Sequence, residues 1–377
     1  MRFMNMKFFS CAAVFLAVIL SATGVIHPDH TGGMALAIVG IGMLDVFKQD
    51  AFGVIALTDA VNKLPFIPGR AGQVITWAET GVPVTSIMIE EVAGELKIIN
   101  PTPRGGPGET SAKDKRTARI LAIPHYQHDD AIYAEEVQGV RAFGQESVLQ
   151  TVFDMVNMRL GQHVQLKLDP TLEYQRIGAI KGTILNGDGS TLYNLFTEFG
   201  VSQEAEIDFD LDNAAPASGA VRKVCTAAVR LVANNLGGIP YQGIYAFCGD
   251  AFWDDLIAHK EVRETFLNQA EASQLRGTSA FQMLDYGGIR FENYRGAVGG
   301  SAFVNTDKVH IFAVGVPGLF RTVYGPADYI ETVNTLGLPR YARQYDMQNG
   351  KGVNLEVQMN GLSYCTRPKT LLLGKRT

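Results

Sequence analysis

The pattern of hydrophobic and polar positions changes several times along the chain, and each change predicts a different element. The mostly apolar segment at residues 44–63 predicts a short arm with helical character. Between residues 85 and 101, apolar and polar side chains alternate around Ala93-Gly94, which is typical of a β-hairpin. A tip rich in proline and glycine, at residues 101–108, and a polar run then lead to a return strand at residues 118–124.

This first hairpin is a long two-stranded excursion with little apolar mass of its own. A lone hairpin is only marginally stable in water, so the excursion needs a surface on which to lie. Because no large domain adjoins it in the sequence, we expect that surface to belong to another subunit. The alternative is a floppy insertion at the protein surface.

From residue 145 to residue 168 the period becomes helical, because apolar side chains recur at every fourth position. These side chains are Val148, Val152, Val156, Leu160, Val164 and Leu168. A strict step of four drifts by about 40° per repeat on a helix of 3.6 residues per turn. The stripe therefore winds, which predicts a long spine helix of roughly 36 Å whose two ends face different partners. Asp169-Pro170 predicts a break and a restart, with a second helical piece ending at Gly182.

The rest of the chain alternates between strand and helix patterns, which predicts a mixed α/β domain. Strands are expected on both sides of a turn at residues 186–189, and the second strand extends to Phe199. A buried strand at residues 244–250, short strands within residues 281–304 and an amphipathic helix at residues 221–236 follow from the same patterns. Residues 322–337 and 353–361 predict a second long hairpin that turns at residues 349–352.

The first residues form a pattern typical of a secretory signal. Arg2 and Lys7 precede an apolar run at residues 8–20, and Ser21-Ala22 supplies the small side chains of a cleavage site. The run is shorter than the span of about 20 residues that a membrane helix needs. Three interpretations stay open. The first residues could be an upstream translation artefact, with the true start at Met34 or Met43, or a leader that is removed before assembly. They could also be a true export signal or a retained apolar segment.

The sequence offers little catalytic or metal-binding chemistry. Cys11, Cys225, Cys248 and Cys365 form no metal-binding spacing and stand among apolar neighbours, which favours buried free thiols. The group His125, His128, Asp129 and Asp130 suits a metal only on a helix, and it follows a strand, so a polar strand end or a subunit contact is the preferred interpretation. No catalytic group, metal site or cofactor site is therefore expected.

Charge narrows the possible partners. A net charge of −5 argues against general phosphate neutralisation as a route to nucleic-acid binding. A local basic run, formed by Lys113, Lys115, Arg116 and Arg119, stands in the first hairpin. It predicts either a solvated tip or electrostatic docking onto an acidic neighbour.

Several stretches, in one order along the chain, resemble the lambda-type major capsid protein family (phage major capsid protein E). They lie at residues 52–69, 101–108, 114–125, 135–144, 176–200, 245–259 and 309–367. The resemblance implies an α+β, Hong Kong 97-like capsid fold with an N-terminal arm, an extended hairpin loop, a peripheral domain with a spine helix, and an axial α/β domain. The implied parts are a signal-like leader or mis-assigned start (1–42), the arm (43–68), the extended loop (69–126), the peripheral domain (127–182 and 321–361) and the axial domain (183–320 and 362–377).

The resemblance also implies the function. The chain would be a non-enzymatic subunit that self-assembles through homo-hexamers and homo-pentamers into the icosahedral head of a tailed double-stranded DNA phage or prophage. Its place would be the virion, after assembly in the host cytoplasm. Partners would be scaffold, portal and decoration proteins, with packaged double-stranded DNA as non-specific content, and no cofactor or small-molecule substrate. The residues predicted at subunit interfaces are Phe47, Phe52, Lys113, Lys115, Arg116, Arg119, Arg340 and Arg343.

Two alternatives remain at this point. A cellular nanocompartment shell would have the same fold and enclose a protein cargo. An exported periplasmic binding protein or enzyme would follow if the signal-like leader were taken at face value, and it would be a monomer with a ligand cleft.

Overall fold

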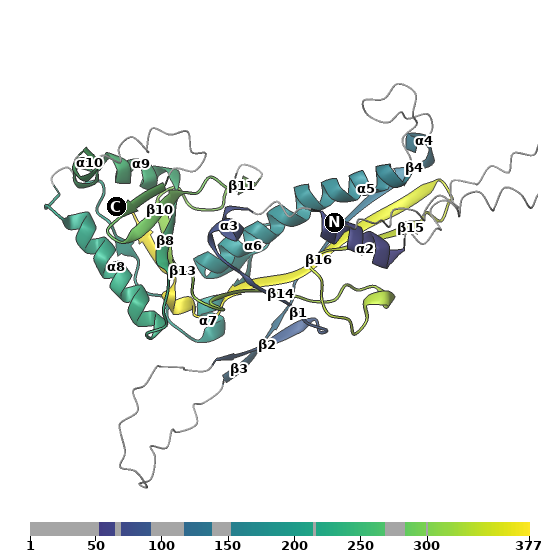
Figure 1. Cartoon of the computed structure of the whole chain (residues 1–377), viewed down its shortest axis with the longest axis horizontal. Coiled ribbons are helices and arrows are strands. Elements are labelled where there is room, and N and C mark those ends of the chain that lie inside the picture. Colours follow the sequence, from purple (N-terminus) through teal and green to yellow (C-terminus); the bar gives the residue numbers. More distant parts are fainter. Residues whose placement is uncertain are drawn as a thin grey trace, which may run out of the picture. The chain divides into compact units, whose positions relative to one another are not determined.

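The computed structural model in Figure 1 describes seven segments of the chain, all of them within the unit Met43–Thr377. The described residues are 53–64, 69–91, 117–137, 152–213, 216–267, 283–298 and 301–377. The predicted leader, Phe47, Phe52, the first hairpin's predicted turn and its tip lie outside them. Two mixed sheets organise the described residues, and the larger of two apolar cores takes in the six-stranded sheet together with Phe320, Val323, Leu362 and Tyr364 of the five-stranded sheet.

A six-stranded sheet forms the centre of the larger core. Its strands, in spatial order, are β7 (Ile207–Asp208), β17 (Leu372–Lys375), β13 (Lys308–Val314), β8 (Gly243–Cys248), β10 (Ile289–Asn293) and β9 (Met283–Tyr286). The central strands β8 and β13 are buried along nearly their whole length, as expected for strands that are covered on both faces. Phe247, Phe252 and Phe312 are fully buried in this core. The predicted mixture of strands and helices in this part of the chain is confirmed.

Three helices pack with this sheet, and the first of them confirms the amphipathic helix predicted at residues 221–236. They are α8 (Ala220–Leu236), α9 (Asp250–Ala258) and α10 (Lys260–Leu267). Helix α8 buries Val221, Cys225, Ala228, Val232 and Leu236 on one face. It ends where Gly237 and then Gly238 adopt positive φ angles of 67° and 82°, a conformation that glycine takes without steric cost. A separate two-stranded pair is formed by β11 (Ala297–Val298) and β12 (Ser301–Ala302).

A five-stranded sheet forms the second part of the structure, and the long strand β16 (Gly352–Cys365) joins its two halves. The other strands are β1 (Ala78–Gly81), β14 (Phe320–Tyr324), β15 (Tyr341–Asp346) and β4 (His125–Tyr133). The C-terminal part of β16 pairs with β14, which in turn pairs with β1. The N-terminal part of β16 lies between β15 and β4.

The predicted turn of the second hairpin is confirmed, but its first strand lies at residues 341–346 rather than at residues 322–337. Strands β15 and β16 are joined by a turn in which the Met347 N–H donates to the Gly352 carbonyl. Residues 322–337, however, are extended only as far as Tyr324. The residues that follow form a loop with one short 3-10 turn, η4 (Ile330–Thr332), because Gly325-Pro326 ends the ladder and Pro326 has no N–H to donate.

The spine helix crosses both parts of the structure beside β16 (Figure 1). It consists of α5 (Val152–His163), the π-helical turn η2 (Val164–Leu168) and α6 (Asp169–Lys181). The predicted break at Asp169-Pro170 is therefore wrong. Asp169 donates its N–H to the carbonyl of Val164, five residues back, and this wider turn accommodates a proline that lacks an N–H.

The apolar stripe is buried as predicted, but its described members all face one partner, so the predicted winding to a second partner within residues 145–168 is wrong. Val156, Leu160, Val164 and Leu168 are buried in a second core, the spine core, between the helix and the five-stranded sheet. Further along, Ile177, Ala179 and Ile180 are buried in the larger core. The spine therefore changes partner only beyond Leu172, after the predicted stripe has ended, and the π-helical turn at Val164–Leu168 offsets the drift that a regular helix would give.

The remaining elements are short. They are α2 (Val54–Lys63), α3 (Arg70–Val74), β2 (Ser86–Glu91), β3 (Thr117–Ala122), α4 (Ala134–Val137), β5 (Thr183–Leu185), β6 (Thr191–Asn194), α7 (Leu195–Phe199) and η5 (Pro368–Thr370). The predicted turn between β5 and β6 is confirmed. The strand predicted to reach Phe199 instead ends at Asn194. The Asn194 side chain accepts hydrogen bonds from the N–H groups of Phe196 and Thr197, and so starts helix α7 as an N-cap.

Candidate subunit interfaces

The described part of the first hairpin is an antiparallel pair of strands with two different apolar faces. In its register Ile87 lies opposite Leu121, and Met88 lies opposite Ile120. Ile87 and Leu121 are buried in the larger core, whereas Met88 and Ile120 are 62% and 68% exposed. The hairpin therefore docks on its own subunit through one face and leaves an apolar cross-strand pair on the other. Such a pair is suited to a further contact.

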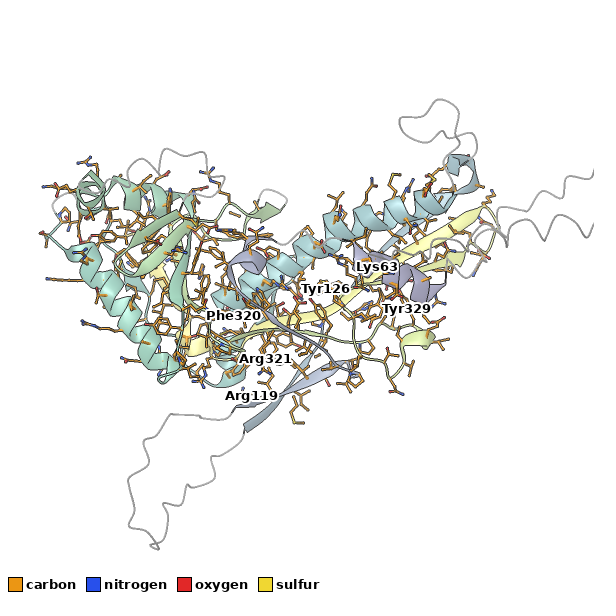
Figure 2. All side chains as sticks on the ribbon, in the orientation of Figure 1. Lys63, Arg119, Tyr126, Phe320, Arg321 and Tyr329 are labelled. Atoms are coloured by element: carbon orange, nitrogen blue, oxygen red, sulfur yellow. The ribbon has the colours of Figure 1, made fainter. Side chains whose placement is uncertain are left out.

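Arg119 holds the hairpin against its own subunit (Figure 2). Its Nη1 donates to the carbonyl oxygen of Thr197 at 2.8 Å, in the last turn of α7, where the carbonyl ends of the helix attract a cation. The side chain remains largely exposed. Lys113, Lys115 and Arg116, the other members of the predicted basic run, lie outside the described residues. Their role at an interface stays a prediction.

Arg340 has a role inside the subunit. Its Nη2 lies 2.7 Å and 2.9 Å from the two carboxylate oxygens of Asp169, and both side chains are almost fully buried. Its Nη1 donates to the carbonyls of Val61 and Leu64 at the C-terminal end of α2. Arg340 thus ties the arm helix to the spine. Its part in a contact between subunits stays a prediction.

Arg343 lies on the opposite side of the same sheet. Side chains alternate along a strand, and Ala342, between the two arginines, is buried in the spine core. The guanidinium carbon of Arg343 lies 5.2 Å from the centroid of the Tyr329 ring, within the range of a cation–π contact (Tyr329 is labelled in Figure 2). The structure therefore separates two arginines that the sequence placed together.

Residues 325–340, here called the apolar loop, form a surface that the strand prediction missed. Ile330, Val333, Leu336 and Leu338 are exposed, Ile330 by 86%. The loop is nevertheless well held. The buried Thr332 hydroxyl donates to the carbonyl of Ala327 at 2.8 Å, and the Leu338 N–H donates to the Tyr341 hydroxyl at 2.9 Å. Pro326, Asn334 and Gly337 are turn-forming residues that could have indicated a loop.

The apolar loop shares its base with the first hairpin. The Gly337 N–H donates to the carbonyl of Val82, and a side chain on Gly81 would collide with the Gly337 carbonyl. Val84, a few residues further, is half exposed. The apolar loop and the segment around Val84, which are far apart in the sequence, thus expose apolar side chains close to the point where their backbones are hydrogen-bonded.

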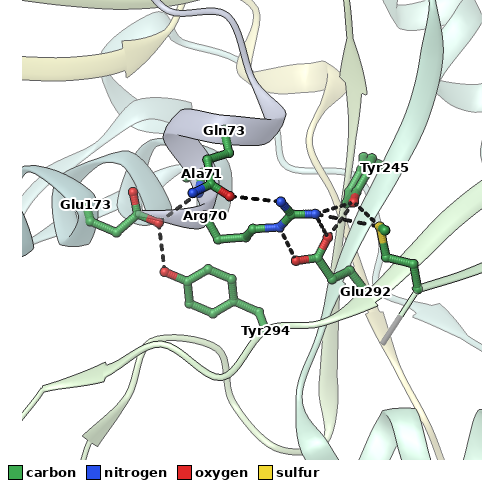
Figure 3. Close-up of polar contacts among 8 residues, drawn as sticks. Arg70, Ala71, Gln73, Glu173, Tyr245, Glu292 and Tyr294 are labelled. Carbon is green, nitrogen blue, oxygen red and sulfur yellow. Dashed lines mark hydrogen bonds and ion pairs between the residues drawn. The ribbon is translucent and has the colours of Figure 1, made fainter. Parts of the chain in front are cut away.

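A buried polar network joins helix α3, the spine and the six-stranded sheet (Figure 3). The Arg70 guanidinium forms two contacts with Glu292, Nε–Oε1 at 2.5 Å and Nη2–Oε2 at 2.8 Å, and Glu292 is fully buried. The Tyr245 hydroxyl also donates to Glu292. The hydrogen bond and the charge of Glu292 raise the pKa of Arg70. No local pattern in the sequence indicates this network, because its members lie far apart along the chain.

Glu173, on the spine, is the second acceptor of this network. Its Oε1 accepts from the Ala71 N–H at 2.8 Å and from the Tyr294 hydroxyl at 2.9 Å. Burial raises the pKa of Glu173, and the hydrogen bonds and the charge of Arg176 oppose this effect only in part. Gly69 packs directly on the carboxyl group, so that a Cβ there would collide with it. Helix α3 is therefore fixed to the spine at close range.

The three cysteines among the described residues are buried and free, as predicted. Burial raises the pKa of Cys225 and of Cys365 to about 12, and it also raises the pKa of Cys248. Such thiols are poor nucleophiles, since the thiolate is the reactive form.

The His125 group divides between the two faces of β4. His128 and Asp130 face the spine, where Asp130 bonds His163 Nε2 at 2.7 Å and Arg159 at 3.1 Å. His125 and Asp129 face the other way, and the His125 ring bonds Asn360 at 2.7 Å. Within the described segments, no group of three or more His, Cys, Asp or Glu side chains is placed to hold a metal ion. Nor is any helix in those segments long and apolar enough to cross a membrane.

The chain is similar in sequence to the major capsid proteins of two phages. The chain is 25% identical over 351 residues to the major capsid protein of Pseudomonas phage KPP10, covering 87% of this chain and 97% of that protein. It is 24% identical over 363 residues to the major capsid protein of Salmonella phage Felix O1, covering 88% and 98%.

The fold is also shared with a solved capsid structure. A crystal structure described as that of a prophage capsid protein from E. coli CFT073 superimposes with a TM-score of 0.52 at 10% identity, covering 86% of this chain and 99% of that one. The predicted α+β, Hong Kong 97-like capsid fold is confirmed. Residues 53–376 match the family of phage major capsid protein E, and the chain therefore belongs to that family.

Proposed function

We propose that this chain, a phage major capsid protein, builds the icosahedral head of a tailed double-stranded DNA phage or prophage through homo-hexamers and homo-pentamers. The observation that carries the proposal is the family match over residues 53–376, which leaves little of the described chain for another task. Proteins of this family are structural components of the virion, and this chain is expected to have no enzymatic activity.

The described surfaces support self-association. The hairpin pair Met88–Ile120 and the apolar loop expose large apolar side chains on well-held backbone. Each contact between subunits is expected to be modest. A closed shell becomes stable because every copy repeats the same contacts with several neighbours.

Further partners belong to the same proposal. Scaffold, portal and decoration proteins would direct assembly in the host cytoplasm, and packaged DNA would be enclosed without being gripped. The net charge of −5 is compatible with a shell that borders DNA rather than neutralises it.

The two alternatives have different standing. An exported binding protein or enzyme is not favoured, because the family match and the capsid fold account for nearly the whole chain. A nanocompartment shell shares the fold, and the contents of the particle would distinguish it, since it would enclose protein rather than DNA.

The test is to express the full chain and the chain from Met43 and to examine both by light scattering and negative-stain electron microscopy. Closed shells, or rings of five and six subunits, are expected from the chain that begins at Met43. Monomers from both chains, even at high protein concentration with a crowding polymer, would contradict the proposal.

A further inference from the structure

Helix α8 differs in charge from the other long helices of the described chain. It contains Arg222, Lys223 and Arg230 and no carboxylate. Each of the other described α-helices of eight or more residues carries at least one aspartate or glutamate. Since the net charge of the chain is −5, this helix is a locally positive element of an acidic protein.

The three cations share the side of α8 that is directed away from the larger core. The helix runs along the outside of the six-stranded sheet (Figure 1). At 3.6 residues per turn the cations fall within a sector of about 100°, opposite the buried face that includes Cys225 and Val232. Arg222, Lys223 and Arg230 are all exposed, and none of their side chains has an ion-pair partner among the described residues.

The carboxylate at the N-terminal end of α8 is committed to other donors. Glu261, on α10, accepts hydrogen bonds from the N–H groups of Val221 and Arg222 and from the Tyr286 hydroxyl. Its charge offsets part of the positive charge of Arg222. Lys223 and Arg230, further along the helix, keep theirs.

The C-terminal end of α8 is also prepared to lie near an anion. Helix carbonyls repel negative charge, but here the Arg367 guanidinium donates to the carbonyl of Leu236 at 3.0 Å. The acidic Glu204 accepts from the Asn235 side chain at 3.1 Å and lies 3.8 Å from the ammonium group of Lys369. The positive face of α8 is therefore not cancelled at this end.

The chemistry of this face fits a polyanion better than a protein. Its exposed side chains are Arg222, Lys223, Ala227, Arg230 and Asn234. None of them is a large apolar or aromatic side chain, and such side chains form the buried centre of protein–protein interfaces. Nucleic-acid phosphates, by contrast, are bound by exposed Lys and Arg without apolar contacts.

The spacing of the cations suits a DNA duplex. Lys223 and Arg230 are seven positions apart, which is about 10 Å along a helix that rises 1.5 Å per residue. A duplex carries one phosphate charge per about 1.7 Å of its axis, so the same length presents about six phosphates. Each cation can therefore pair with a different phosphate, in a contact that depends on charge and not on base sequence.

We propose that the exposed face of α8, formed by Arg222, Lys223 and Arg230, contacts the phosphates of double-stranded DNA. The inference rests on the proposed function and names the surface of the subunit that borders the enclosed DNA. Three contacts per copy are few, so each subunit binds DNA weakly and the shell repeats the contact. The net charge of −5 does not prevent it, because charges further away than about 10 Å are largely screened at 0.1 M salt.

The test measures how tightly unassembled full-length subunits bind a fluorescent duplex of about 30 base pairs between about 50 and 200 mM salt. The logarithm of the affinity falls with the logarithm of the salt concentration by about 0.9 per phosphate contact. Three contacts therefore predict a slope of about −2.7, or about fortyfold weaker binding over this range. The face variant, Arg222→Gln with Lys223→Gln and Arg230→Gln, should bind at least about tenfold more weakly at the lower salt and lose most of the slope.

Two controls separate this face from net charge and from folding. Lys63→Gln with Lys167→Gln and Lys351→Gln changes the net charge equally at exposed positions outside α8, and should stay within about twofold of the wild type. Arg222→Lys with Arg230→Lys retains the charge and should retain the slope. Circular dichroism checks folding. If the face variant does not fold, Lys223→Gln alone should reduce the slope by about 0.9.

Three results would overturn the inference. The wild-type subunits could show no salt-dependent binding of the duplex. The folded face variant and the Lys63 control could lose affinity equally, which would show that only net charge matters. Subunits that bind a polyglutamate peptide but not the duplex would identify an acidic protein as the partner of α8. Shell formation by the wild type is scored separately by light scattering, so subunits that assemble without binding DNA contradict this inference and leave self-assembly intact.

Discussion

The six-stranded sheet and the five-stranded sheet bury their strands in different ways. Strands β8 and β13 are apolar nearly throughout and are closed off on both sides within the subunit. Strand β16 alternates strictly in its N-terminal half, with one face in the spine core and the other polar. The first sheet is covered on both faces, whereas the second exposes polar side chains such as Asp129 on one face and an apolar loop beside it. Stability and assembly should therefore respond to different substitutions.

The largest expected effect lies in the larger core. Phe312 on β13 is fully buried, and its ring centroid is 5.2 Å from that of Phe247. Phe312→Ala should lower the free energy of unfolding by about 3–5 kcal/mol, because it removes apolar contacts and leaves a cavity. Chemical denaturation of unassembled subunits measures this loss. A loss below about 1 kcal/mol would show that this core repacks easily, and the stability of the subunit would then not depend mainly on the six-stranded sheet.

Arg340→Ala should cost about 3 kcal/mol in the spine core, since it leaves the Asp169 carboxylate buried without its cation. The damage should be local. Hydrogen exchange should increase in α2 and at the start of α6, and should stay unchanged in the six-stranded sheet. The double variant Arg340→Leu with Asp169→Leu is the control and should recover much of the stability. Increased exchange throughout β8 and β13 would mean that the two cores unfold together.

Glu173→Gln tests the junction between the two parts through its pH dependence. The pKa of Glu173 is raised by burial, so the folded state binds more protons than the unfolded state between the unfolded and the folded pKa. Stability due to this group is therefore highest below the unfolded pKa, falls as the pH rises to the folded pKa, and is constant above it.

Glutamine removes this titration and still offers an oxygen to the Ala71 N–H and the Tyr294 hydroxyl. The stability of Glu173→Gln relative to the wild type should thus improve between about pH 4 and pH 7. Thermal unfolding at both pH values measures the change. An identical difference at both would show that Glu173 does not titrate in this range.

The smallest effect on stability, with a clear effect on assembly, is expected in the apolar loop. Ile330→Ser should change the free energy of unfolding by less than about 0.5 kcal/mol, because the side chain is exposed. It should nevertheless lower the yield of shells. Ile257→Ser, at a partly exposed position on α9, is the matched control and should leave the yield unchanged. Equal losses of shell yield from both variants would show that the apolar loop is no more important for assembly than the exposed surface of α9.

Local periodicity predicted the elements whose burial is decided nearby in the sequence. The stripe of α8, the buried strand β8 and the turn before β16 all follow from residues within one element. The break at Asp169-Pro170 failed for a physical reason. Its local signal is real, but Asp169 binds Arg340, 171 positions later, and a π-helical turn accommodates the proline. Tertiary contacts outweighed the local preference.

The candidate interfaces were harder to predict because exposure depends on the whole fold. Arg340 and Arg343 looked alike in the sequence, and one lies buried against the spine while the other reaches Tyr329. Ile330, Val333 and Leu336 fit a strand until Pro326 and Asn334 are weighed as turn residues. The network of Arg70, Glu173 and Glu292 joins residues more than one hundred positions apart, and no pattern within a window could have found it.

Strand β16 also has a mechanical consequence. At about 3.3 Å per residue its fourteen residues span about 45 Å, and its two halves are bonded to different partners, β4 and β15 at one end and β14 at the other. A pull on the turn at residues 347–351 would load these ladders in shear, along the strand, so that many hydrogen bonds share the force. Strand β16 should therefore resist a force that acts along its own direction. Such a force should have to be far larger than one that separates β15 from β16 one hydrogen bond at a time.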